Sequence, residues 1–253
     1  AEMKKLLLLS IPRVFSLVGL QLMYFVEGII ATALSPGNLT VLRYAQDVQS
    51  FPVGIIGVSV AISSFSVMSK LSLDGAFSSL HRFLRKKIDH LLLLLIPASF
   101  GMFLFSTPIV NLLLGGGEFS LQAIQDTAKV LQILSVGIPF MALVPLLMRV
   151  FFSFQDTIRP MIVTITAMVF NSILAIFLAH RFEVSGIAFA ATFTAIFAVI
   201  ILILMLRIRY VSGFSHILAF PSMLVYLLSS SLMSVVLKPL LSSFPFSDQT
   251  LPL

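Results

Sequence analysis

The chain has 253 residues, of which 58% are hydrophobic and only 10% are charged, and its mean hydropathy is +1.09. A soluble domain carries roughly a quarter charged residues, so this composition excludes a soluble globular protein. Cysteine is absent, which excludes disulfides, thiolate metal sites and a catalytic thiol. The net charge of +6 would suggest nucleic-acid binding in a soluble protein, but in a membrane protein its distribution between loops must be considered first.

Long charge-poor stretches predict membrane-spanning helices, because a helix needs about 20 largely apolar residues to cross a bilayer. They predict an all-α, polytopic membrane protein with seven spans in residues 1–239, followed by a short tail at 240–253. The spans are 11–34, 39–68, 88–114, 124–152, 160–179, 185–206 and 217–237. The chain begins at Ala1 without an initiator Met, as expected of a fragment.

Lysine and arginine are distributed unequally between the two ends of these spans. If the spans alternate in direction, one side carries twelve of them: Lys4, Lys5, Arg13, Lys70, Arg82, Arg85, Lys86, Lys87, Arg149, Arg159, Arg207 and Arg209. The other side carries four: Arg43, Lys129, Arg181 and Lys238. The positive-inside rule then predicts a cytoplasmic N-terminus. The net charge is thus a topology signal, and we expect membrane lipids as partners and no nucleic acid.

The basic segment 81–87 is expected to lie in a cytoplasmic loop. Its simplest interpretation is an orientation determinant that touches anionic lipid headgroups. A docking site for another protein is the alternative.

Three charged residues lie too deep in the predicted spans to be loop residues. Glu27 falls near the middle of the first span, where a carboxylate is costly unless it is paired, protonated or bound to a cation. Arg43 and Asp47 lie four residues apart on the second span, so they share a helix face. They can pair with each other or with groups outside this chain. Because polar side chains inside a membrane face a bundle interior or a wet cavity, we expect Arg43, Asp47 and Glu27 to line a substrate pathway.

Oxygen-bearing side chains also occur in the fifth and sixth spans, namely Asn171, Thr192 and Thr194. Together with Glu27, Asn171 and Thr194 could bind a monovalent cation such as sodium, which prefers several oxygen ligands, or could serve proton coupling. The alternative is hydrogen bonding between membrane helices. No other cofactor is predicted.

Enzymatic motifs are absent from the sequence. The four histidines fall near the ends of predicted spans, and HExxH, GxSxG and Walker lysine patterns do not occur. The chain is therefore predicted not to be an enzyme.

Several short motifs follow one another in an order typical of one transporter family. They are Leu42-Arg43-Tyr44-Ala45, Phe51-Pro52-Val53-Gly54-Ile55-Ile56-Gly57, Pro97-Ala98-Ser99-Phe100-Gly101, Pro108-Ile109-Val110, Gly117-Glu118-Phe119, Arg149-Val150-Phe151-Phe152-Ser153-Phe154-Gln155-Asp156-Thr157-Ile158-Arg159-Pro160, Asn171 and Ser185-Gly186-Ile187-Ala188. Over roughly residues 11–210 the chain resembles the C-terminal half of the MurJ/MviN family. These are the lipid II flippases of the multidrug/oligosaccharidyl-lipid/polysaccharide exporter superfamily.

The resemblance implies one lobe of a two-lobed transporter in the bacterial cytoplasmic membrane. Such a protein moves the undecaprenyl-pyrophosphate-linked peptidoglycan precursor from the inner to the outer leaflet by alternating access, and its N-terminal lobe is missing here. Two positions depart from the family pattern. Asp47 stands where the family has an arginine, and Ala175 stands where relatives have a carboxylate one turn after the position of Asn171.

Two alternatives stay open at this stage. Fold does not fix the substrate, so the protein could export a drug or another polyprenyl-linked sugar. It could also be a non-transporting scaffold that docks cell-wall enzymes through residues 81–87.

Overall fold

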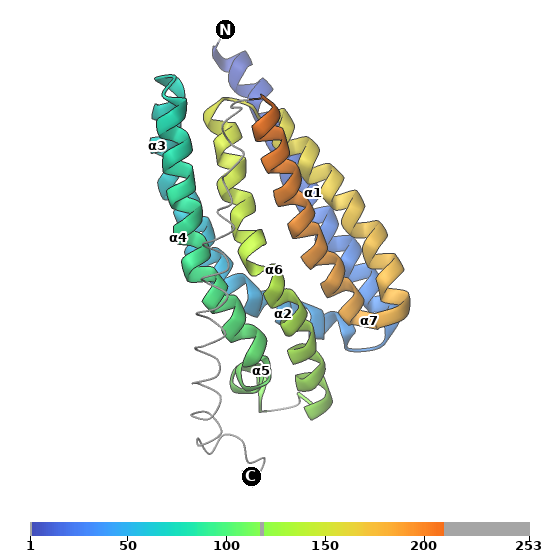
Figure 1. Cartoon of the computed structure of the whole chain (residues 1–253). Coiled ribbons are helices and arrows are strands. Elements are labelled where there is room, and N and C mark those ends of the chain that lie inside the picture. The colour runs from blue at the N-terminus through green and yellow to red at the C-terminus, as the bar shows by residue number, and fades with distance from the viewer. Residues whose placement is uncertain (1, 117–118, 210–253) are drawn as a thin grey trace.

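The computed structural model describes residues 2–116 and 119–209, so the predicted span 217–237 and the tail lie outside the described residues. Their elements are α1 (Glu2–Leu34), α2 (Asn38–Pro52), the π-helical segment η1 (Val53–Val58), α3 (Ser59–Leu73), α4 (Phe77–Leu104), α5 (Ser106–Leu114), α6 (Leu121–Ser153) and α7 (Ile158–Arg209). No strand occurs in this part of the chain (Figure 1). The prediction of an all-α membrane protein is confirmed.

Five helical stretches in the described ranges are long and apolar enough to cross a membrane. They are Val14–Leu34, Asn38–Leu73, Phe77–Leu104, Leu121–Ser153 and Ile158–Ile208. The second contains α2, η1 and α3 as one continuous rod, in which the helix continues past Pro52 through the π-helical segment.

Helix α7 is a hairpin of two antiparallel arms. Glu183 has φ 50° and ψ −135°, far from helical values, and the chain reverses there. Figure 1 shows the two arms side by side, and the rings of Phe170 and Phe197 stack between them with centroids 4.4 Å apart. The arms lie where the spans 160–179 and 185–206 are predicted.

The region predicted as a single span at 88–114 differs from the prediction. It forms α4, which begins earlier at Phe77, and the shorter α5, with a break at Phe105. Pro108 explains the break, because a proline ring clashes with the carbonyl four residues earlier, here that of Leu104 in α4.

The loop expected at 81–87 is also wrong, because these residues lie in the first turns of α4, while their cytoplasmic side stays a prediction. Leu80, Leu84 and Ile88 recur at helical spacing and are all at most 1% exposed. This apolar stripe packs inward and makes the segment an amphipathic helix, with Arg85 and Lys86 on its exposed side.

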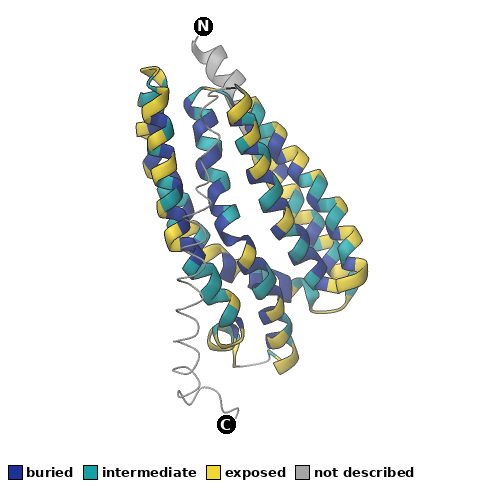
Figure 2. Cartoon of the chain, viewed as in Figure 1, coloured by how far each residue is buried: buried dark blue, intermediate teal, exposed yellow. Residues whose placement is uncertain are grey.

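Helix α6 is the central element of the described residues. It packs against α7, α4, α2, α3, α5 and η1, and Figure 1 shows it between α4 and the α7 hairpin. Figure 2 shows buried residues along most of its length, in agreement with its core positions such as Leu131, Leu146 and Phe151.

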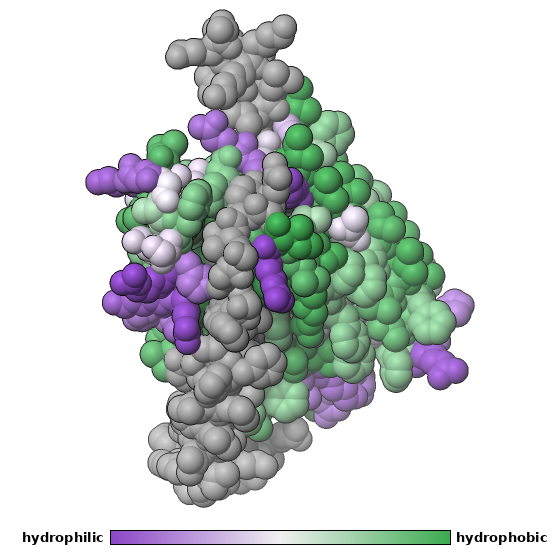
Figure 3. Space-filling model, turned by 45° about the horizontal axis from the view of Figure 1, so that its top comes forward, coloured by the Kyte–Doolittle hydropathy of each residue, from purple (hydrophilic) through white to green (hydrophobic). Residues whose placement is uncertain are grey.

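The outer faces of α1 and α7 instead expose large apolar side chains, and Figure 3 shows a broad hydrophobic surface interrupted by hydrophilic patches. Lipid is the environment that suits such a surface.

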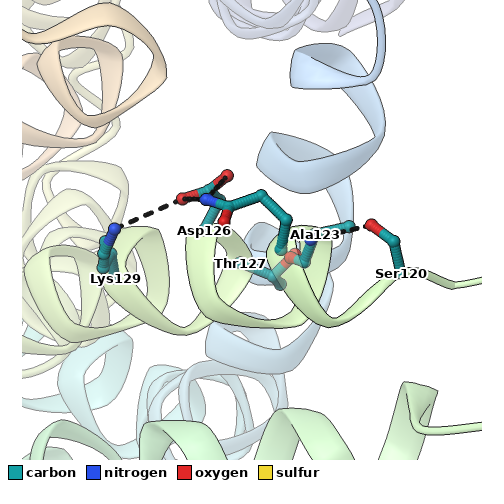
Figure 4. A network of polar contacts seen from close by, with 6 residues as sticks. Ser120, Ala123, Asp126, Thr127 and Lys129 are labelled. Atoms are coloured by element: carbon teal, nitrogen blue, oxygen red, sulfur yellow. Dashed lines mark hydrogen bonds and ion pairs between the residues drawn. The ribbon is translucent and has the colours of Figure 1, made fainter.

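Polar contacts fix the start of α6 (Figure 4). Ser120 is its N-cap, and its Oγ accepts a hydrogen bond of 3.1 Å from the backbone N–H of Ala123. Asp126 pairs with Lys129 at 3.4 Å, and Thr127 donates to the carbonyl of Ala123. This solvated end contrasts with the apolar remainder of the helix.

The motif that ends with Asp156-Thr157-Ile158-Arg159-Pro160 forms the turn between α6 and α7. Asp156 Oδ1 accepts a hydrogen bond of 3.2 Å from the backbone N–H of Arg159, and its other oxygen pairs with the Arg159 guanidinium. The carboxylate thus satisfies a free N–H in the first turn of α7, where a negative charge also complements the helix dipole. The motif has a structural role here.

Gly57, the second glycine of the Pro-x-Gly-x-x-Gly motif, allows η1 to approach α6 closely. A Cβ at this position would lie 2.6 Å from Ala142 Cβ and 3.0 Å from Ala142 Cα. A Cβ at Gly54, in the same π-helical segment, would meet nothing within 4 Å.

We therefore expect Gly57→Ala to lower the free energy of unfolding by about 1–3 kcal/mol, the usual cost of overpacking. The matched variant Gly54→Ala should be neutral or slightly stabilising, because alanine favours a helix over glycine. Unfolding of the purified protein in mixed micelles measures both. Equal effects of the two variants would contradict the close approach of η1 to α6.

Candidate substrate-pathway site

A turn at residues 35–37 brings α2 back against α1 and sets up the site. Gly37 has φ 91°, a left-handed conformation that glycine adopts without strain, and α2 begins at the next residue. The apolar side chains Val41, Leu42 and Ala45 are buried and fix which face of α2 points inward. Arg43 and Gln46 then project beside the α1 residues Tyr24 and Glu27.

Glu27 is 1% exposed and accepts hydrogen bonds on both carboxylate oxygens. Asn171 Nδ2, from the first arm of α7, donates to Oε1 at 2.7 Å, and Gln46 Nε2 donates to Oε2 at 2.9 Å. The fully buried Asn171 in turn accepts a hydrogen bond of 3.2 Å on Oδ1 from Thr194 Oγ1, on the second arm. One carboxylate therefore connects α1, α2 and both arms of α7.

Arg43 lies at the outer end of the same network. Its Nη1 donates to Gln46 Oε1 at 3.0 Å, and its Nη2 donates to the backbone carbonyl of Tyr24 at 2.8 Å. The guanidinium carbon lies 5.7 Å from the centroid of the Tyr24 ring, within the range of a cation–π contact. These three contacts hold the guanidinium against α1.

The internal pair of Arg43 with Asp47, one of the two predicted alternatives, is not formed. Arg43 turns toward α1, while Asp47 is exposed, and its carboxylate makes no hydrogen bond or ion pair with any described residue. The four-residue spacing allows a pair but does not require one, since Gln46 and the Tyr24 carbonyl compete for the guanidinium.

Arg43 borders two neighbouring pockets along α1. One has a volume of about 520 Å³ and is lined by Phe25, Gly28, Ile29, Thr32, Ala33, Leu39 and Arg43. The other, of about 680 Å³, is lined by Leu17, Val18, Gln21, Leu22, Tyr24, Phe25 and Arg43. Arg43 is the sole charged residue in either lining. The arrangement therefore offers one fixed cation between two largely apolar hollows.

The sequence-predicted residues thus fall into two groups. Glu27, Asn171 and Thr194 are brought together as expected, whereas Thr192 points elsewhere and donates to the carbonyl of Ile133 on α6 at 3.1 Å. The roles of Gln46 and Gly28 were not predicted from the sequence. The spacing of Gln46, three residues after Arg43 on the same helix face, was the available signal.

The fit of this cluster to a monovalent cation depends on which of its oxygens are free to act as ligands. A cation would need the oxygens of Glu27, Asn171 and Thr194, but two amide N–H groups already point at the carboxylate and the Asn171 oxygen already accepts a hydrogen bond. Ala175, one turn after Asn171, is fully buried in an apolar cluster and offers no further oxygen ligand. In this arrangement the residues do not fit a bound cation and instead form a complete hydrogen-bond network.

The fold and the site together define a polytopic membrane protein in which helices surround a buried polar network. The chain matches the family model "Lipid II flippase MurJ" over residues 1–251, and it belongs to this family. It is 29% identical over 194 residues to the probable lipid II flippase MurJ of Rickettsia prowazekii, an alignment covering 77% of this chain and 38% of that protein. The counterpart in Borreliella burgdorferi is 30% identical over 172 residues, covering 68% and 34%.

Solved structures agree in fold. A lipid II flippase MurJ in an inward closed conformation superposes with a TM-score of 0.76 at 24% identity, covering 90% of this chain and 46% of that one. A transporter of the MOP superfamily from Pyrococcus furiosus superposes with a TM-score of 0.72 at 17% identity, covering 93% and 53%. The chain therefore spans about half or less of the proteins it matches.

The network predicts a specific energetic coupling. Asn171→Ala removes partners from both Glu27 and Thr194, so its effect on the free energy of unfolding should not add to that of Thr194→Val. We expect an interaction free energy of about 0.5–1.7 kcal/mol from a double-mutant cycle in mixed micelles. Thr192→Val is the matched control, because Thr192 bonds to α6. The change that it causes in the free energy of unfolding should therefore add to that of Asn171→Ala. Additivity in both cycles would contradict the network.

Proposed function

We propose that this chain forms one lobe of a flippase that moves lipid II from the inner to the outer leaflet of the bacterial cytoplasmic membrane. The observation that carries the proposal is Arg43, the single charged residue lining two apolar pockets in a chain of the lipid II flippase family. The N-terminus of the chain lies on the cytoplasmic side, as the excess of lysine and arginine on that side indicates.

Arg43 binds the diphosphate of the substrate. A guanidinium has five N–H donors, and two of them are directed to Gln46 and the Tyr24 carbonyl. The remaining three are free to donate to phosphate oxygens in the fork geometry that suits this anion. Because the protein contacts fix the guanidinium beforehand, little side-chain entropy is lost when the anion binds.

The apolar linings on either side of Arg43 accommodate the polyprenyl part of the substrate. Phe25, which borders both pockets, and neighbours such as Leu22 and Ile29 present hydrocarbon to the lipid chain. The membrane potential assists the transfer, because each negative charge moved outward across an inside-negative membrane gains roughly 2.3 kcal/mol per 100 mV. No step requires nucleotide hydrolysis or a catalytic residue.

The other lobe of the transporter supplies the opposite wall of the pathway. The curated relatives are about two and a half to three times as long as their alignments with this chain, which leaves room for a second lobe. In the proposed cycle, the two lobes rock against each other and expose Arg43 alternately to the two sides of the membrane.

A second candidate function, export of a cationic compound, is favoured by one observation. Asp47 places an exposed carboxylate one turn from Arg43, at a position where the resemblance implies an arginine. Export of a cationic compound by the full-length protein, in addition to transport of lipid II, would support this alternative over a purely anionic substrate.

Arg43→Ala in the full-length protein should abolish rescue of cells depleted of their own flippase. Loss of charge-assisted hydrogen bonds costs about 1.5–3 kcal/mol, which corresponds to a roughly ten- to hundredfold weaker binding of lipid II. Arg43→Lys should retain part of the activity, because the charge remains but the fork geometry is lost. Arg181→Ala, at an exposed position near the turn of α7, is the control and should rescue as wild type does. Full rescue by Arg43→Ala would refute the proposed substrate contact.

Substrate binding should also protect the pocket from chemical modification. This chain has no cysteine, so Thr32→Cys in an otherwise cysteine-free full-length protein places one thiol in the 520 Å³ pocket beside Arg43. A water-soluble thiol reagent should modify it, and lipid II should slow the reaction several-fold. Gln125→Cys, at the exposed start of α6, should react at the same rate with and without lipid II. Equal rates at Thr32→Cys would place the substrate elsewhere.

A further inference from the structure

Gln46 stands between the two opposite charges of the site. Its Nε2 donates to Glu27 Oε2 at 2.9 Å, and its Oε1 accepts from Arg43 Nη1 at 3.0 Å. Arg43 and Glu27 make no ion pair with each other in the described part of the chain, although a single amide group separates them. The amide therefore occupies the place where a direct salt bridge would otherwise form.

Burial gives Glu27 a strong tendency to acquire a cationic partner. It is 1% exposed, and the hydrogen bonds that it accepts all come from neutral amides. A buried carboxylate is costly to ionise without a counter-charge, so its ionised form favours an ion pair with the nearest guanidinium. Arg43 has a long, flexible side chain and is that guanidinium.

We propose that Gln46 is a positioning residue that keeps Arg43 in the substrate pocket by preventing its collapse onto Glu27. The oriented amide presents its N–H₂ to the carboxylate and its carbonyl to the guanidinium, so it satisfies both charges while holding them apart. Removal of the amide frees Arg43 to pair with Glu27 and withdraws the only charge from the pocket linings. The positioning of Arg43 by Gln46 does not depend on the proposed function, whereas its consequence for transport rests on the proposed role of Arg43.

Gly28 makes the outer position of Arg43 possible. A Cβ on Gly28 would lie 3.1 Å from Arg43 Nη2, a tight contact that would require the guanidinium to shift by a few tenths of an ångström. The absent side chain thus provides the space in which the guanidinium reaches the Tyr24 carbonyl. Gly28 and Gln46 therefore both favour the outer position of the Arg43 guanidinium. Gly28 leaves space for it beside α1, and Gln46 occupies the space between it and Glu27.

The test measures where the Arg43 guanidinium lies, without any substrate. Phenylglyoxal modifies accessible guanidinium groups, and mass spectrometry of the peptide that contains Arg43 gives the extent of reaction in the purified full-length protein. We expect Gln46→Ala to reduce modification of Arg43 several-fold, because the guanidinium becomes buried in an ion pair with Glu27. The double variant Glu27→Gln with Gln46→Ala should restore modification toward the wild-type level, since no charge then draws Arg43 inward.

The matched control is Gln49→Ala, on the same helix. Gln49 is also buried, but its amide donates to the carbonyl of Leu134 and to the sulfur of Met141 on α6, away from Arg43. Its removal should leave modification of Arg43 unchanged, and Glu27→Gln should have no restoring effect in that background. Unchanged or increased modification in Gln46→Ala would overturn the inference, as would a failure of Glu27→Gln to restore it.

A second measurement separates this inference from the proposed function. Undecaprenyl diphosphate in nanodiscs is the probe, and its affinity is measured for wild type, Arg43→Ala, Gln46→Ala and the double variant. Weaker binding by Gln46→Ala, with recovery in the double variant, supports the inference. If Arg43→Ala weakens binding but Gln46→Ala does not, the positioning role is refuted while the proposed function stands. If wild type does not bind the probe, the proposed function fails, and the modification experiment alone decides the role of Gln46.

Discussion

The buried carboxylate of Glu27 is the constraint on which the rest of the site depends. A charge in the middle of a membrane helix is tolerated only when the surrounding groups compensate for the lost hydration. Here the compensation comes from two amides on two other helices, and one of these amides is itself held by a threonine on the second arm of α7. The positions of α1, α2 and the α7 hairpin are therefore interdependent at one point, even though apolar packing supplies most of the contact around it.

Helix α6 provides the rigid support for this arrangement. It has buried residues along most of its length and contacts the helices on both sides, so it behaves as the core of the lobe while α1 and α7 present apolar faces outward. The close approach at Gly57 and the hydrogen bond from Gln49 to the Leu134 carbonyl fix the rod of α2, η1 and α3 against it. The polar network is thus anchored to α6 both through α2 and through α7, where Thr192 donates to the Ile133 carbonyl.

Much of this fold could be predicted from the sequence, because membrane spans are defined by hydrophobicity and length. Both properties can be read from the sequence without knowledge of tertiary contacts. The convergence of Glu27, Asn171 and Thr194 could also be predicted, since polar side chains in apolar helices must find one another. The amphipathic start of α4 could not be recognised by charge alone, because its buried stripe of Leu80, Leu84 and Ile88 is masked by the basic residues between them. The pairing of Arg43 with Asp47 failed as an alternative because helical spacing describes only neighbours on the same helix. The competing partners, Glu27 through Gln46 and the Tyr24 carbonyl, come from a tertiary contact.

Charge balance connects Ala175 and Asp47, the two positions at which the resemblance implies other residues. The network contains one carboxyl group, that of Glu27, and one guanidinium, that of Arg43, and Gln46 joins them, while Ala175 adds no further acidic group. A second carboxylate would leave a net negative charge in the membrane interior, where an uncompensated charge is expensive and a bound cation would be favoured. Asp47 lies outside this network, on an exposed face, and leaves its balance unchanged. The interior of the site is therefore self-compensated, and the charge available to a substrate is set by Arg43 and Asp47 at its surface.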